Sequence, residues 1–127
     1  MTLSNFFTVA AIVDLAFGLG FVLVTLPFVL LYNVTLNAGG VFVGQLFGAA
    51  LIGFGVLNWF ARTVSDHKAV RAIVLGNLVS AALGFVIALI GQLTVVGGVN
   101  QLGWSTVAIY LLLALGFGYF QFVKPRG

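Results

Sequence analysis

The stretch GQLFGAALIGFGVLNWFAR, from Gly44 to Arg62, is apolar along nearly its whole length and then ends on a charge. An α-helix needs about 20 mainly apolar residues to cross a bilayer. This stretch, taken as 41–61, meets that requirement, and so do the stretches at about 6–32, 70–96 and 104–123. The sequence therefore predicts an all-α fold, an integral membrane four-helix bundle that forms a single transmembrane domain over residues 1–127.

The overall composition supports this interpretation. Of the 127 residues, 62% are hydrophobic and 6% are charged, whereas about a quarter of the residues of a typical soluble domain are charged. So few charges cannot cover the surface of a water-soluble fold. The apolar runs are continuous rather than alternating, which argues against a membrane β-barrel.

The basic residues indicate how the bundle is oriented. Arg62, Lys68 and Arg71 lie at the joint between the second and third predicted helices, and Lys124 and Arg126 follow the fourth. With four spans, all five fall on one side of the membrane, which the positive-inside rule assigns to the cytoplasm. We therefore expect both termini inside. This placement also accounts for the pI of about 9.8 without a nucleic-acid partner.

Small residues are expected to hold the helices together, because lipid is as apolar as leucine and cannot drive their association. Six glycines at helical spacing are expected to pack helix against helix: Gly18, Gly44, Gly48, Gly55, Gly84 and Gly91. Gly44 and Gly48 also fit the small-xxx-small pattern of a dimerisation face, so a homo-oligomer stays an alternative. Pro27, near the outer end of the first helix, is expected to bend it.

Asp14 is an acid within an apolar helix, where an ionised carboxylate facing lipid would be costly. We expect it to belong to a polar layer in the cytoplasmic third of the bundle, formed by Asp14, Asn58, Arg62, Asn77, Ser80 and Gln121. Three interpretations stay open. Asp14 could be a hydrogen-bonding hub for the two asparagines, could pair with Arg62 or Arg71, or could bind a proton, a cation or the polar head of a ligand.

Residues for catalysis or metal binding are scarce. His67 is the single histidine, it lies in a predicted loop, and the chain has no cysteine. One histidine and two acids cannot form a clustered metal site or a convincing catalytic triad. We therefore predict no catalytic residue, no metal and no cofactor. A bound lipid, quinone or pigment stays compatible with the aromatic residues, although most of these fit interfacial anchors.

Three segments resemble those of a known group of proteins. They are GQLFGAALIGFGVLNWFAR before the basic loop, VLGNLVSAALG after it (Val74–Gly84), and GWSTVAIYLLLALGFGYF near the end (Gly103–Phe120). Together they resemble the small four-helix membrane proteins of the DoxX-like type and related families of unknown function. The resemblance implies a bacterial inner-membrane bundle, and some members of that broad group are accessory subunits of redox systems. It assigns no role to an individual residue.

Two functions are therefore predicted. The first is a non-catalytic accessory or structural subunit that packs against a larger membrane complex, such as an energy-transducing one. The second is a small oligomeric transporter, channel or binding protein for an amphipathic ligand such as a quinone, acting through the layer around Asp14. Membrane lipids are expected partners in both cases.

Overall fold

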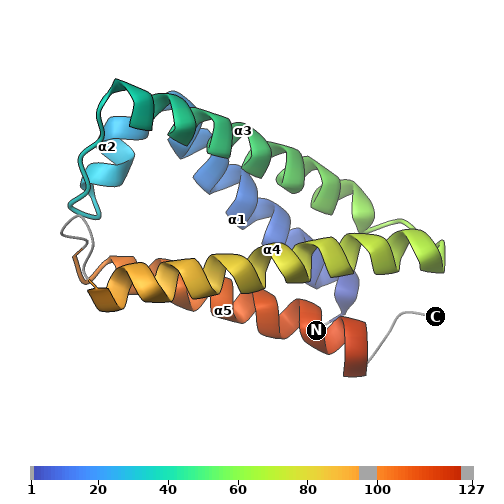
Figure 1. Cartoon of the computed structure of the whole chain (residues 1–127). Coiled ribbons are helices and arrows are strands. Elements are labelled where there is room, and N and C mark those ends of the chain that lie inside the picture. The colour runs from blue at the N-terminus through green and yellow to red at the C-terminus, as the bar shows by residue number, and fades with distance from the viewer. Residues whose placement is uncertain (1, 95–99, 124–127) are drawn as a thin grey trace.

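The helices of the computed structural model, which describes residues 2–94 and 100–123, follow the predicted order (Figure 1). They are α1 (Leu3–Leu23), α2 (Thr25–Leu30), α3 (Ala38–Ala61), α4 (His67–Thr94) and α5 (Gly103–Gly118), and α5 continues into the π-helix η2 (Tyr119–Val123). Four spans are long and apolar enough to cross a membrane: Leu3–Leu23, Ala38–Ala61, His67–Thr94 and Gly103–Val123. The expectation of an all-helical chain with four long apolar helices is confirmed.

The first predicted helix, 6–32, is not continuous. It breaks at Val24, whose φ of −138° and ψ of 51° are not helical, and α2 begins at the next residue. Pro27 explains the position of the break, since proline lacks an N–H and its ring collides with the carbonyl four residues earlier, here that of Leu23. The helix is therefore interrupted about one turn before Pro27, and not bent at Pro27 itself as expected.

Two helix starts depend on side-chain caps. The hydroxyl of Thr2 accepts a hydrogen bond from the Asn5 N–H at 3.1 Å, and Oδ1 of Asn37 accepts one from the Gly40 N–H at 2.7 Å. Such caps satisfy amide groups that have no partner within the helix. The cap at Asn37 accounts for the start of α3 at Ala38, earlier than the predicted residue 41. The predicted end of the third helix at residue 96 lies outside the described residues.

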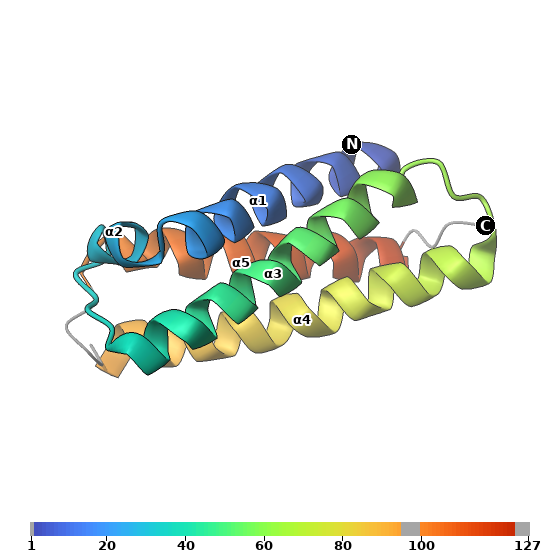
Figure 2. The same ribbon diagram turned by 90° about the horizontal axis from the view of Figure 1, so that it is seen from above.

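The long helices form two pairs, α1 with α3 and α4 with α5 (Figures 1 and 2). The pairs meet at one end of the bundle through a cluster of buried side chains and diverge toward α2 (Figure 1). We call the end around that cluster the closed end and the opposite end, which carries α2, the cavity end. The cluster contains residues from all four long helices: Leu3, Phe7, Ala10, Ala61, Val70, Val74, Phe117 and Phe120.

Candidate functional site

Three polar side chains, one each from α1, α3 and α4, are hydrogen-bonded to one another. They lie about one helical turn from the closed end, toward the middle of the bundle. Nδ2 of Asn58 donates to Oδ2 of Asp14 at 2.9 Å and to Oδ1 of Asn77 at 3.0 Å. Nδ2 of Asn77 donates back to Oδ1 of Asn58 at 2.8 Å and to the carbonyl of Ile73 at 2.9 Å. We call these three residues the amide network. Both asparagines are buried and use both of their amide hydrogens, so the network links α1, α3 and α4 with fully engaged donors.

In the described part of the chain, the other residues expected in the polar layer make no hydrogen bond to this network, although Ser80 lines a small cavity together with Asp14 and Asn77. Arg62 turns to its own helix, where Nε donates to the Trp59 carbonyl at 2.8 Å and the guanidinium lies 3.6 Å from the centre of the Trp59 ring. Ser80 is exposed. Gln121 lies in η2, and its buried Oε1 has no hydrogen-bond partner among the described residues. The hydrogen-bonded layer is thus smaller than expected. Its geometry is that of the hydrogen-bonding hub, because among the described residues Asp14 bonds to Asn58 and to neither Arg62 nor the exposed Arg71.

The predicted packing glycines mostly lie at close helix contacts. A Cβ added to Gly18 would lie 2.9 Å from the Gly48 carbonyl, and one added to Gly48 would lie 2.8 Å from the Gly18 carbonyl. Gly44 similarly faces the methyl of Thr25, and Gly55 faces Leu15. The Gly44–Gly48 face is therefore occupied by α1 and the start of α2 of the same chain, which leaves it unavailable to a second copy.

The remaining predicted glycines, on α4, differ from each other. Gly84 lies beneath the ring of Tyr110, which a Cβ would overlap. The packing contact expected of Gly91 is not observed, because among the described residues a Cβ there would have nothing within 4 Å. Sequence reasoning also missed Gly116, which lies beneath the ring of Phe6. Gly91 has no such neighbour because it borders a cavity.

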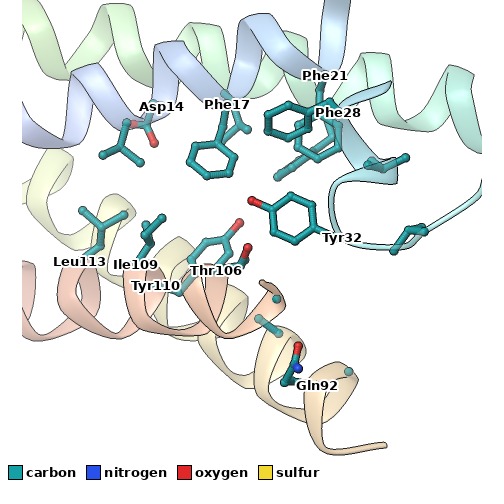
Figure 3. Close-up of a pocket in the computed structure, with 18 residues that line it drawn as sticks. Asp14, Phe17, Phe21, Phe28, Tyr32, Gln92, Thr106, Ile109, Tyr110 and Leu113 are labelled. Carbon is teal, nitrogen blue, oxygen red and sulfur yellow. The ribbon is translucent and has the colours of Figure 1, made fainter. Parts of the chain in front are cut away.

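That cavity, of about 300 Å³, lies between the two helix pairs (Figure 3). Its larger side chains are aromatic and come mainly from α1, α2 and α3, whereas α4 and α5 contribute several small residues. The lining comprises Val13, Asp14, Phe17, Phe21, Phe28, Val29, Tyr32, Val34, Phe47, Leu51, Ala88, Gly91, Gln92, Gly103, Thr106, Ile109, Tyr110 and Leu113. A mostly apolar cavity with a few polar groups is typical of small-molecule sites.

The polar groups of the cavity lie along its length. Figure 3 shows Asp14 toward one end and Tyr32 toward the other, with the hydroxyls of Thr106 and Tyr110 directed into the space between them. Oδ2 of Asp14 accepts the bond from Asn58, while Oδ1 accepts none from the described part of the chain. Asp14 and Tyr110 also line a second, smaller cavity of about 70 Å³, together with Asn77 and Ser80. One carboxylate oxygen thus holds the network and the other remains available.

The cavity end is held by hydrogen bonds around Asn100. Its Nδ2 donates to the carbonyl of Leu31 at 3.0 Å, and its backbone N–H donates to the carbonyl of Tyr32 at 3.1 Å. Its own carbonyl accepts a bond from Nε2 of Gln92 at 3.1 Å. The start of α5 is thereby tied to the end of α2 and to α4.

No family model, curated protein or solved structure matches the chain. Within residues 2–94 and 100–123, no group of three or more His, Cys, Asp or Glu side chains could hold a metal ion. The cavity and the amide network are therefore the features of the described residues that point to a function. Sequence reasoning identified Asp14, Asn58 and Asn77 but not the cavity residues Tyr32, Gln92, Thr106 and Tyr110 as a site.

Proposed function

We propose that this chain is an integral membrane protein that binds a membrane-soluble amphipathic small molecule in its 300 Å³ cavity. The observation that carries the proposal is the cavity itself, an apolar space between the helix pairs with a carboxylate at one end. A quinone, a pigment or a single lipid chain has the apolar body that such a space would accept. The polar part of the molecule would meet Asp14, Thr106 or Tyr110.

The packing of the closed end favours a binding site over a pore. Phe7 and Phe117 are fully buried there, one to two turns from the amide network, and they belong to the continuous apolar cluster. An ion or a polar solute leaving the cavity toward that end would have to cross these side chains. A dead-end site holds a molecule, whereas a channel needs a hydrated path.

The membrane orientation belongs to the same proposal. Arg62, Lys68 and Arg71 flank the α3–α4 connection at the closed end, and the positive-inside rule would place that end in the cytoplasm of a bacterial cell, with both termini inside. The cavity would then lie in the outer half of the membrane. Packing against a larger complex stays a prediction, for which the outward-facing Leu, Val and Phe side chains offer the surface.

The experiment uses two matched glycine substitutions on α4. In the part of the chain that the structure describes, neither Gly91 nor Gly76 has an atom within 4 Å of an added Cβ, but only Gly91 of the two borders the cavity. We expect native mass spectrometry of the membrane-extracted protein to show a retained small molecule in the wild type and in Gly76→Leu, and to show its loss in Gly91→Leu. Equal retention in both variants, or a wild type of bare protein mass, would overturn the proposal.

A further inference from the structure

Among residues 2–94 and 100–123, no basic side chain lines the surroundings of the Asp14 carboxyl. The residues that line its two cavities include no Lys, Arg or His. Arg62, the basic residue expected near it, is engaged with the carbonyl and ring of Trp59. The amide of Asn58 supplies one hydrogen bond to the carboxylate but no charge. A carboxyl in low-dielectric surroundings either takes up a proton or needs a cation beside it, because an unpaired buried charge is costly.

Aromatic rings line the cavity beside this carboxylate. Phe21 packs edge-to-face on Phe28 and on Phe47, each with ring centres 5.0 Å apart, and Phe17 packs on Phe28 at 5.6 Å. This wall extends over α1, α2 and α3, and Tyr32 and Tyr110 add two further rings to the lining. Faces of aromatic rings attract organic cations, and enclosure of an ammonium by several rings is a recurrent means of recognising it.

From these two features we infer that the cavity selects a lipophilic organic cation, with its positive head against the free Oδ1 of Asp14 and its apolar groups along the phenylalanine wall. The inference deepens the proposed function and rests on it. A neutral molecule could fill the same apolar space, and a hydroxyl could donate a hydrogen bond to Asp14. Neither would neutralise the carboxylate nor gain from the ring faces, so charge complementarity favours the cation.

The test compares two probes of equal shape. Benzyltributylammonium carries a positive charge, and its carbon isostere, in which carbon replaces the nitrogen, does not. Equilibrium binding of each radiolabelled probe is measured with the purified protein in nanodiscs of zwitterionic lipid. We expect the wild type to bind the cation at least about tenfold more tightly than the isostere, a difference of about 1.4 kcal/mol, because the carboxylate and the ring faces both favour the positive charge.

The chain offers a matched pair of charge-removing variants. Asp14→Asn keeps an oxygen that can accept the Asn58 hydrogen bond, and Asp66→Asn removes the other acid, which is exposed before α4. We expect Asp14→Asn to weaken binding of the cation but not of the isostere, so that the preference that remains is the contribution of the ring faces, and Asp66→Asn to leave both affinities unchanged. If Asp14→Asn does not fold, the comparison of the two probes on the wild type still decides the question.

The outcomes separate this inference from the proposed function. Equal affinity for both probes, or unchanged cation binding in a folded Asp14→Asn, overturns the cation inference while the cavity stays a binding site. Binding of neither probe also overturns it. The proposed function is then decided separately by whether the protein retains a small molecule from its own membrane.

Discussion

The closed end and the cavity end are built by the same helices from similar residues, yet only one of them is filled. At the closed end the ring of Phe6 lies over Gly116, with its centre 4.8 Å from that of Phe117. At the cavity end no ring of the described residues lies opposite Gly91, and the phenylalanines pack edge-to-face on one another instead. An end is closely packed where a large side chain of one helix pair faces a small residue of the other pair, and it is hollow where no such match exists.

The amide network marks the boundary between these two ends. Asp14, Asn58 and Asn77 each lie about one turn from a residue of the buried apolar cluster, and Asp14 also borders the cavity. Hydrogen bonds between helices are directional, so they hold three helices in one register where apolar packing alone would permit sliding. The network therefore fixes the geometry of the wall against which a ligand would lie.

The largest expected loss of stability comes from a substitution that separates α1 from α3, because the contact between these helices supports both ends. Gly48→Val would place a Cβ 2.8 Å from the Gly18 carbonyl, and a backbone oxygen cannot move aside without moving its helix. We expect the free energy of unfolding to fall by about 3 kcal/mol, at the upper end of typical overpacking costs. Reversible unfolding in mixed detergent and sodium dodecyl sulfate measures it.

The matched control for this substitution is Gly53→Val on the same helix. No atom of residues 2–94 or 100–123 lies within 4 Å of a Cβ added to Gly53, so the same chemical change meets open space. We expect a change of less than about 1 kcal/mol, within the range of helix propensity differences. Similar losses at Gly48 and Gly53 would contradict the close approach of α1 and α3.

A substitution in the amide network, at the boundary between the two ends, is expected to lower the free energy of unfolding by less. Asn58→Leu removes the donor to Asp14 and leaves the amide of Asn77 without its partner. Leaving a buried polar group unpaired costs about 2 kcal/mol. The same unfolding titration, with Asn5→Leu in the exposed first turn of α1 as control, measures the loss.

A double-mutant cycle isolates the pairing of the two asparagines from general effects of leucine. In the cycle of Asn58→Leu with Asn77→Leu, we expect a coupling energy of about 1 kcal/mol, in the range measured for polar pairs between membrane helices. Additive single losses would indicate that the two amides do not interact, and the register of α3 against α4 would then depend on packing alone.

Sequence reasoning could predict the spans and part of the site because these depend on one helix at a time. Apolar length located the helices, and the expected depth of Asp14, Asn58 and Asn77 within their helices brought them together as observed. Arg62 was predicted wrongly because the ring of Trp59, one turn away on the same helix, offered a nearer partner.

The cavity could not be predicted because it depends on what lies opposite each residue. Thr106 and Tyr110 are four residues apart and so share a helical face, which is the one sequence signal for the polar side of the cavity. Glycines at helical spacing give the same sequence pattern whether an aromatic ring covers them, as at Gly84, or no described residue does, as at Gly91. The distinction appears only when the helices are placed together.

The smallest expected effect is at the cavity end, where a few exposed hydrogen bonds replace the packing of the closed end. Asn100→Ala removes the bond to the Leu31 carbonyl and the one that Oδ1 of Asn100 accepts from the Leu102 N–H. We expect the free energy of unfolding to fall by about 1 kcal/mol or less, as for an ordinary hydrogen bond with access to water. The local effect should be larger, with faster hydrogen exchange at amides of α2 than in the wild type and unchanged exchange around Phe7.

Gln101→Ala, a neighbouring exposed change that leaves these bonds in place, should alter neither region. Equal acceleration at both ends would mean that the bundle opens as one unit, and the cavity end would then be no easier to open than the closed end.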